Sequence, residues 1–169
     1  MTIRPRRSVL YMPGSNTRAI EKARSLPADG IILDLEDAVA PDAKVAAREQ
    51  VAAAVKAGGF GSREVFIRVN GIDTPWHAED IIAAAAAAPD AILVPKINNS
   101  DQLEMVGRRL LDMSCNKKTR IWAMIETPFA ILNILDIAAA AKDSETRLSG
   151  FVLGTNDLAK ETSAKLLPG

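Results

Sequence analysis

The chain has 169 residues, of which 48% are hydrophobic and 25% are charged, as is ordinary for one globular domain with a real core. Its 21 basic and 21 acidic residues balance each other. No strong electric field therefore favours nucleic acid or an anionic membrane surface, and we expect neither as a partner.

Cys115 is the single cysteine, which excludes an internal disulfide and fits a reducing, cytoplasmic setting. At the start of the chain, a short apolar run follows the basic residues 4–7 and soon meets Pro13 and Gly14. This pattern predicts neither a signal peptide nor a membrane span. We therefore expect a cytoplasmic protein.

Apolar runs and helical patterns alternate along the chain, which predicts repeated strand-then-helix units. The predicted strands are residues 8–12, the start of 30–39, 65–70, 91–97, 120–126 and 149–153. The first three predicted helices are residues 16–26, residues 41–56 and the stretch from Pro75 through the alanines 83–88. A fourth is capped within residues 99–101, and a short last one follows residues 154–156. Between them, a helix starts at 127–128, with Ile131, Leu132, Leu135 and Ile137 as its apolar residues. Capping side chains and first-turn prolines indicate where these helices begin.

Polar residues gather where the predicted strands end. In the stretch Gly30–Val39, three apolar residues lead directly into acidic ones, at positions 34, 36 and 37. A buried strand tolerates carboxylates at its end only where something pairs with them or uses them. The later strands end in the same way, at Arg68 and Asn70, Lys96, Glu126 and Asp157. This asymmetry predicts a parallel α/β barrel with its active site at the carboxyl ends of the strands.

The length of the chain bears on how complete this barrel is. A full eight-stranded barrel takes about 250 residues, so the chain falls roughly two βα units short. An open six-stranded sheet would leave apolar edges exposed and prone to association. No linker rich in proline, glycine or serine separates the units. We therefore expect residues 1–169 to form a single domain, the N-terminal portion of a TIM (β/α)8 barrel truncated to about six βα units, without its C-terminal units and lid region.

Glu126 and Asp157 follow consecutive predicted strands, so we expect them to be neighbours on the active face. Two carboxylates, with waters and substrate oxygens in the remaining positions, match the ligands that Mg²⁺ prefers. The alternative interpretation is that Asp157 caps a helix and Glu126 pairs with an arginine. The spacing leaves both interpretations open.

Arg68 and Lys96 are basic residues at the same predicted edge. If Arg68 points inward, it forms either a structural ion pair with the carboxylates of residues 34–37 or a fork that receives a substrate carboxylate or thioester oxygen. Lys96 could form a Schiff base with a substrate, or it could neutralise the carboxylate cluster. Nothing local in the sequence selects between these roles.

The turn at residues 154–156 opens the last short helix, whose free backbone N–H groups could hold a carboxylate. A tight turn needs glycine in any case, so a purely structural role is the alternative. We expect His77, at the start of a helix, to be a surface residue without a role, and Cys115 to be structural.

Six motifs occur in register along the chain: RSVLYMPGSN, GIILDLEDAV followed by Pro41 and Lys44, FIRVNG, ILVPKI, IETPFAILN and GFVLGTNDLA. From about Arg6 to Ala159 they closely resemble the citrate lyase β-subunit-like family of acyl-CoA lyases. That family belongs to the HpcH/HpaI group of Mg²⁺-dependent aldolases, built on phosphoenolpyruvate-binding barrels. The resemblance implies Claisen chemistry that cleaves or forms a carbon–carbon bond in a malyl-, methylmalyl-, citramalyl- or citryl-thioester.

The resemblance also implies roles for individual residues. Glu126 and Asp157 match the family's metal ligands, which bind Mg²⁺. Arg68 matches the arginine that contacts the substrate and the developing enolate. Glu36 and Asp37 match the acidic pair around that arginine and the metal-bound waters, and they are counted with Arg68 as catalytic.

Further substrate contacts are implied at two loops. The first loop, with Tyr11 and Arg18, lies where such enzymes approach the thioester carrier, which is CoA or an acyl-carrier group. The amides of Gly154, Thr155 and Asn156 would reach the substrate carboxylate. In this family the acid/base carboxylate and much of the carrier site come from the C-terminal part, often in a neighbouring subunit. The resemblance therefore implies a homo-oligomer, a trimer or hexamer, and makes activity of the isolated chain uncertain.

Two other functions stay open from the sequence. One is a pyruvate-type class II aldolase that acts on free hydroxy-keto acids, within the same broad group. The other is a non-catalytic truncated fragment that binds metal or a partner through its open edge.

Overall fold

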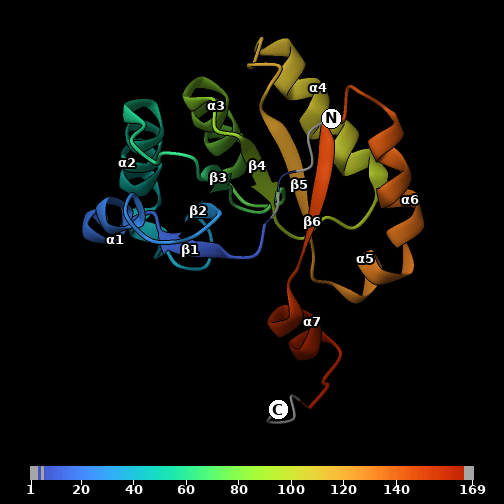
Figure 1. Cartoon of the computed structure of the whole chain (residues 1–169). Helices are drawn as coiled ribbons and strands as arrows, with labels where there is room; N and C mark the ends of the chain where they lie inside the picture. The colour runs from blue at the N-terminus through green and yellow to red at the C-terminus, as the bar shows by residue number, and fades with distance from the viewer. Residues whose placement is uncertain (1–3, 5, 166–169) are drawn as a thin grey trace.

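The computed structural model of the chain describes residue 4 and residues 6–165. Its six strands form one parallel sheet in the order of the sequence. The strands are β1 (Val9–Pro13), β2 (Gly30–Asp34), β3 (Glu64–Arg68), β4 (Ala91–Val94), β5 (Arg120–Ile125) and β6 (Leu148–Leu153). Every neighbouring pair is parallel, so all the carboxyl ends lie at one edge of the sheet (Figure 1). The predicted strands and their α/β arrangement are confirmed.

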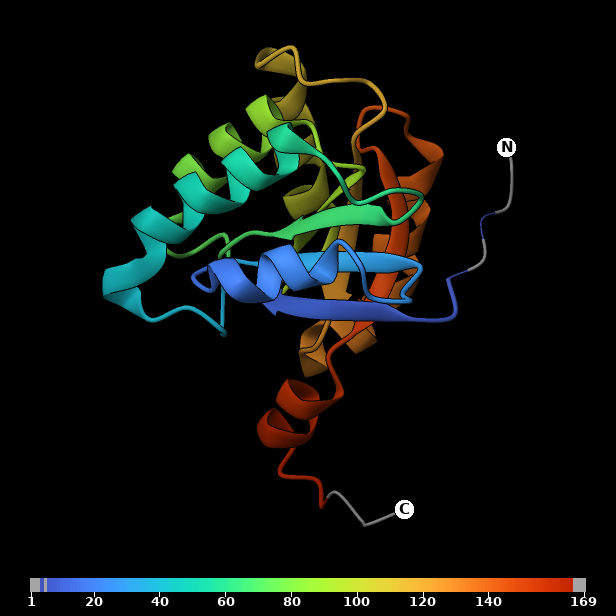
Figure 2. The same cartoon turned by 60° about the vertical axis from the view of Figure 1, so that its left-hand side comes forward.

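Helices follow the strands as the sequence predicts. They are α1 (Thr17–Ala23), η1 (Pro41–Ala43), α2 (Lys44–Ala57), α3 (His77–Ala87), α4 (Ser100–Asp112), α5 (Pro128–Leu132), α6 (Ile134–Ala139), η2 (Ala140–Lys142) and α7 (Thr155–Glu161). Asn16, Asn99 and Thr127 each accept a hydrogen bond from the main-chain N–H three residues later, which fixes where α1, α4 and α5 begin. In both views α7 projects from the carboxyl end of β6, away from the sheet (Figures 1 and 2).

The two faces of the sheet bury different side chains. The larger cluster lies between sheet and helices and includes Ile31 and Leu33 of β2. The smaller cluster, on the opposite face, consists of Ile32, Phe66, Ala91, Leu93, Trp122 and Met124. Phe66 and Trp122 meet edge to face there, with their ring centroids 4.7 Å apart. Because side chains alternate along a strand, Arg68 shares the inner face with Phe66 and points inward.

The sheet is open at both sides within the described residues. There, β1 and β6 are the outer strands and pair with no further strand. Large apolar side chains near these edges are partly exposed: Tyr11 on β1 by 41%, Phe151 and Leu153 on β6 by 41% and 60%. Six parallel βα units with open edges are the arrangement that the sequence predicts for a truncated barrel.

The helix expected from residue 127 onward is broken at Asn133 into α5 and α6. Of its predicted apolar residues, Ile137 is fully buried, whereas Leu132 and Leu135 are 82% and 85% exposed. Leu132 lines an apolar groove between α5 and the segment of α7, together with Pro128 and Ile131. None of the described helices is both long enough and apolar enough to cross a membrane.

Gly107 in α4 packs against the main chain of the loop before β6, and an added Cβ would lie 2.9 Å from Thr146 Cα. Although alanine is the better helix former, we expect Gly107→Ala to lower the free energy of unfolding by about 1–3 kcal/mol. Urea unfolding followed by circular dichroism measures this change. The matched control is Gly71→Ala, whose Cβ would be 3.7 Å from its nearest neighbour, Thr74. Equal losses for the two variants would contradict the packing argument.

Candidate active site

A cavity of about 300 Å³ lies at the carboxyl ends of the strands, beside the start of α7. Its lining residues come from β1, β3, β5, β6 and the segments that follow β2, β5 and β6: Tyr11, Asp37, Arg68, Met124, Glu126, Val152, Leu153, Gly154, Thr155, Asn156 and Asp157. Of the site residues expected from the sequence, Glu36 and Arg18 do not line this cavity. The structure thus brings together residues that are far apart in the sequence.

Arg68 is the buried cation of this cavity, with 6% of its surface exposed. Its Nε and Nη2 each donate a hydrogen bond of 2.6 Å to the carboxylate of Asp34, which is 1% exposed. Burial alone lowers the pKa of Arg68, but the hydrogen bonds and charge of Asp34 raise it above its usual value. The guanidinium therefore remains charged and fixed in direction.

The remaining nitrogen of Arg68 faces other groups. Nη1 lies 2.9 Å from Glu36 Oε2 and 3.3 Å from Asp37 Oδ2. The contact with Glu36 Oε2 lacks hydrogen-bond geometry, and that buried oxygen accepts no hydrogen bond within the described residues. The Tyr11 ring lies under the guanidinium, with its centroid 5.1 Å from Cζ. Arg68 therefore forms the structural ion pair that was one of its two predicted roles, and its third nitrogen is turned toward the acidic loop at the cavity. Its contact with a substrate oxygen stays a prediction.

Asp34 also anchors the loop that follows β2. Its Oδ1 accepts a hydrogen bond of 2.8 Å from the Glu36 N–H, and its Oδ2 accepts one of 3.1 Å from the Ala38 N–H. One carboxylate thus holds both Arg68 and the loop that carries Glu36 and Asp37. The sequence marked Asp34 as one of three carboxylates at a strand end, but it did not show which of them binds the arginine.

Lys96 bridges the carboxylates of two loops. Its Nζ donates a hydrogen bond of 2.6 Å to Glu36 Oε1, and its backbone N–H donates one of 2.9 Å to Glu126 Oε1. Burial lowers the pKa of Lys96, but its hydrogen bond to Glu36 and the negative charges of the nearby carboxylates together raise the pKa above the usual value. A protonated amine cannot attack a carbonyl, so the geometry favours the neutralising role over Schiff-base chemistry.

Glu126 directly follows β5, and Asp157 follows the turn after β6. Glu126 is 2% exposed and accepts from the Lys96 main chain, not from an arginine. Asp157 lies in the first turn of α7, whose N-cap is Gly154, and its Oδ2 is 4.0 Å from Lys96 Nζ. Burial raises the pKa of Glu126 to about 7, and the negative charges of Glu36 and Asp157 act in the same direction. The pair therefore forms a place where an added cation would be favourable.

Gly154 allows the turn after β6 to pack closely against Glu126. A Cβ on this residue would overlap both the carboxylate and the Cβ of Glu126. The Gly154 N–H donates to the Ile125 carbonyl at 3.0 Å, so it is already used within the turn. The glycine thus has the structural role that the sequence left open.

Arg18 and His77 lie away from the cavity. Arg18 is exposed on α1, whereas the other residue expected from the first loop, Tyr11, does line the cavity. The expectation for His77 was wrong: it is 4% exposed, and its Nδ1 donates a hydrogen bond of 2.8 Å to the Asn70 carbonyl. A lone histidine after a loop carries no sequence signal for this burial. Cys115 is buried, as expected for a structural residue.

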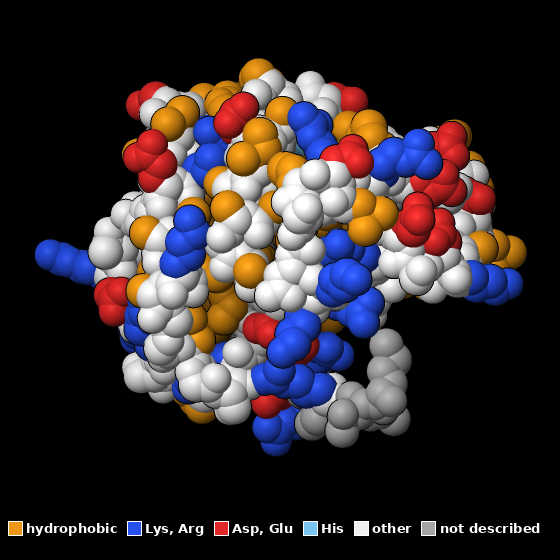
Figure 3. Space-filling view, turned by 90° about the horizontal axis from the view of Figure 1, so that it is seen from above, with side chains coloured by type: hydrophobic (Ala, Val, Ile, Leu, Met, Phe, Trp, Pro, Cys, Tyr) orange, Lys and Arg blue, Asp and Glu red, His pale blue; other side chains and the backbone are white. Residues whose placement is uncertain are grey.

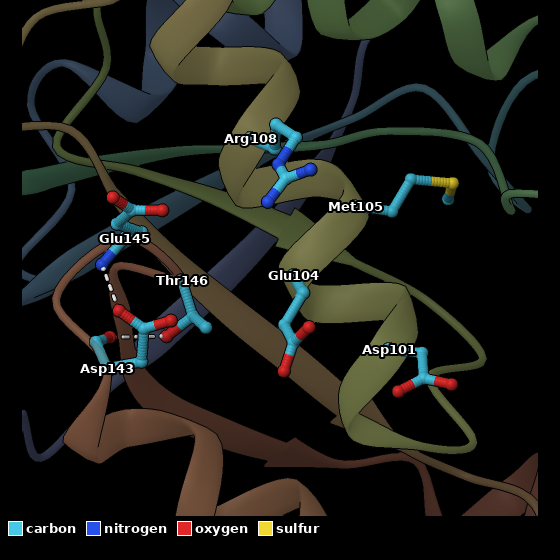
Figure 4. Close-up of a pocket in the computed structure, with 7 residues that line it drawn as sticks. All are labelled: Asp101, Glu104, Met105, Arg108, Asp143, Glu145 and Thr146. Carbon is cyan, nitrogen blue, oxygen red and sulfur yellow. Dashed lines mark hydrogen bonds between the residues drawn. The ribbon is translucent and has the colours of Figure 1, made fainter.

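A second cavity, of about 320 Å³, lies between α4 and the loop before β6 (Figure 4). Its charged residues are Asp101, Glu104, Arg108, Asp143 and Glu145. They are exposed, and they form no buried ion pairs like those of Arg68 within the described residues. The molecular face opposite α7 carries acidic and basic side chains side by side (Figure 3), in keeping with the balanced charge of the chain.

Comparisons with known proteins give a family and relatives. A family model described as HpcH/HpaI aldolase/citrate lyase matches residues 7–167. The chain is 47% identical, over 164 residues, to a (3S)-malyl-CoA thioesterase of Cereibacter sphaeroides, covering 97% of this chain and 54% of that protein. It is 33% identical to an L-malyl-CoA/beta-methylmalyl-CoA lyase of the same species, covering 92% of this chain and 50% of that protein. The chain spans about half the length of these curated relatives.

Among solved structures, the chain resembles the protein CitE from Mycobacterium tuberculosis in complex with magnesium, acetoacetate and coenzyme A. The TM-score is 0.72 at 26% identity, with 94% of this chain and 52% of that chain covered. With the six parallel βα units described above, this likeness confirms the predicted fold, a TIM barrel truncated to about six units.

Removing the charge of Asp34 tests whether the buried pair holds the site together. We expect Asp34→Asn to lower the free energy of unfolding by about 3–5 kcal/mol, because it leaves the buried Arg68 charge without its partner. Urea unfolding measures the loss. Asp37→Asn is the matched control: it removes a carboxylate from the same arginine, but the Asp37 side chain is 62% exposed. Its cost should stay below about 1 kcal/mol. Equal costs would contradict the assignment of Asp34 as the anchor.

Proposed function

Because the chain belongs to the HpcH/HpaI aldolase/citrate lyase family, we propose that the protein carrying it is a Mg²⁺-dependent lyase of malyl-type 3-hydroxyacyl-CoA thioesters. The reaction breaks the bond between the hydroxyl-bearing carbon and the carbon next to the thioester carbonyl. The hydroxyl loses its proton to a base and becomes the carbonyl of an α-keto acid, while the thioester leaves as its enolate and is then protonated. The observation that carries the proposal is that Arg68, Glu126 and Asp157 line one cavity.

The residues present fit a magnesium ion. Glu126 and Asp157 supply two carboxylates, and burial, together with the negative charges of Glu36 and Asp157, raises the pKa of Glu126. Within the described residues, no three acidic, histidine or cysteine side chains gather closely enough to hold a metal alone. Such a pair leaves coordination positions for waters and substrate oxygens, as Mg²⁺ usually requires. When bound, the ion would supply positive charge that polarises the keto-acid oxygens of the substrate.

Arg68 would stabilise the charge that develops on the thioester oxygen. Because Asp34 holds two of its nitrogens, the guanidinium keeps one direction and needs no reorganisation during the reaction. Tyr11 closes the space on one face of the guanidinium. Lys96 and Glu36 would remain an ion pair at the rim of the site and keep the local charge balanced.

Thioester hydrolysis is the second candidate reaction, and the 47% identity to a malyl-CoA thioesterase favours it. The same positive groups could stabilise the oxyanion that forms when water attacks the thioester carbonyl. Both reactions would use the same substrate, but the lyase would break a carbon–carbon bond and the thioesterase would break the thioester bond.

Product analysis with malyl-CoA separates the two reactions. The natural protein that carries this sequence is incubated with malyl-CoA, with and without Mg²⁺, and the products are separated by liquid chromatography. We expect acetyl-CoA and glyoxylate in equal amounts, formed only with Mg²⁺. Malate with free CoA would instead establish the thioesterase. Absence of both product pairs, also from methylmalyl-, citramalyl- and citryl-CoA, would contradict the whole proposal.

The proposal includes a cytoplasmic location and a homo-oligomer. A cytoplasmic setting is supported by the lone, buried cysteine. Association is supported by the partly exposed apolar side chains on the outer strands β1 and β6. Neither the number of subunits nor their symmetry follows from these edges.

The metal assignment predicts how binding changes when either carboxylate is neutralised. We expect Glu126→Gln and Asp157→Asn each to weaken Mg²⁺ binding by at least about tenfold, measured by isothermal titration calorimetry. Glutamine can still accept the Lys96 N–H, so the loss reports charge rather than folding. Asp101→Asn, in the second cavity, is the matched control and should bind as the unchanged chain does. Unchanged affinity in both site variants would refute the assignment.

Arg68 should matter for turnover more than for substrate affinity. We expect Arg68→Ala to reduce kcat by about 10²–10³ with a smaller effect on KM, because its contact strengthens as charge develops. Since the substitution leaves Asp34 unpaired, Arg68→Lys is assayed beside it; lysine keeps the charge but not the fork. Arg108→Ala removes an exposed arginine from α4 and serves as the control. Normal turnover by a folded Arg68→Ala protein would disprove this role.

A further inference from the structure

Lys44, the first residue of α2, is a buried lysine that the proposed chemistry does not use. It is 6% exposed, and its Nζ donates hydrogen bonds of 2.8 Å to the Leu35 carbonyl and 2.6 Å to the Glu36 carbonyl. Nζ also lies 5.4 Å from the ring centroid of Trp76. A buried charge is costly unless its partners are well placed, and here the partners are two consecutive main-chain carbonyls.

These bonds complete a clamp around Glu36. Its N–H donates to Asp34 Oδ1, and its carbonyl accepts from Lys44 Nζ and, at 3.0 Å, from the Val39 N–H. With both main-chain groups held, the backbone at Glu36 has little freedom to rotate, so the direction of its side chain is fixed. That side chain meets Lys96 through Oε1 and Arg68 through Oε2.

We propose that Lys44 is a positioning residue. It fixes Glu36 against Arg68 and Lys96 and so keeps these two cations in place at the cavity. This inference rests on the proposed function for its effect on catalysis, but not for its effect on the loop. Lys44 touches no lining residue through its own hydrogen bonds, so it acts through Glu36.

A second cationic residue of α2 secures the loop after β3 through side-chain hydrogen bonds. Arg48, one turn after Lys44, donates to Asp80 Oδ1 at 2.7 Å, and Asp80 Oδ2 accepts from both the N–H and the side-chain amide of Asn70. His77 Nδ1 donates to the Asn70 carbonyl. Thus α2 presents two cations on one side, and each secures the loop after a different strand, β2 or β3.

Amide hydrogen exchange, read residue by residue by NMR, tests the inference without any substrate. In Lys44→Met, which keeps most of the side-chain volume, we expect the Glu36 and Ala38 amides to exchange at least about tenfold faster. Amides in the central strands β4 and β5 should keep their rates, because the change is local. Lys44→Arg keeps a buried cation and should restore much of the protection.

Lys56→Met is the matched control, because it makes the same substitution at an exposed position of α2. Its loop amides should exchange as in the unchanged chain. If Lys44→Met does not fold, Lys44→Gln replaces it, and the same two amides must again exchange faster. Unchanged rates at Glu36 and Ala38 in a folded Lys44 variant would overturn the proposal. A uniform rise that includes β4 and β5 would also overturn it, since it would show a merely structural role.

The catalytic consequence is measured separately. With malyl-CoA, Lys44→Met should lower kcat by about 10–10²-fold while KM changes little, because Glu36 and Arg68 lose their alignment. If the unchanged protein turns over none of malyl-, methylmalyl-, citramalyl- and citryl-CoA, the proposed function fails, while the exchange result still decides the role of Lys44. Faster loop exchange with unchanged kcat would overturn the catalytic part of the inference.

Discussion

Arg68 and Asp34 bring opposite charges into a place where each residue is less than a tenth exposed. Taking such ions out of water costs several kcal/mol per ion, and only good geometry with further hydrogen bonds offsets this cost. The structure meets that condition, because Asp34 accepts hydrogen bonds from two nitrogens of Arg68 and from two loop N–H groups at once. The direction of the cation and the path of the acidic loop therefore depend on the same carboxylate.

The rest of the site extends from this pair. Glu36, on the loop after β2, accepts a hydrogen bond from Lys96 Nζ, and the backbone N–H of Lys96 in turn donates to Glu126. Gly154 allows the last turn to pack against Glu126, which brings the start of α7 to the cavity. A site held in this way presents its charges already oriented, and this condition makes electrostatic stabilisation of a reacting group effective.

Much of this arrangement follows from local sequence patterns. Apolar runs that end in polar residues gave the strands and the edge where Arg68, Glu126 and Asp157 meet. The pairing of Arg68 with Asp34 depends on register, since the two residues are direct partners across β2 and β3, and register is not written in either strand alone. The burial of His77 and the two bonds of Lys44 depend on how loops pack against α2 and α3. Such contacts between distant segments leave no periodic signal in the sequence.

Crystals of the protein grown with Mn²⁺, which takes oxygen ligands as Mg²⁺ does, test the central claim most directly. Anomalous scattering locates the ion without reference to any assay. The account predicts one strong peak within coordinating distance of both Glu126 and Asp157, with the Arg68 fork still held by Asp34. A peak bound elsewhere, or none at this pair at saturating Mn²⁺, would contradict the claim that this cavity is a metal-dependent active site.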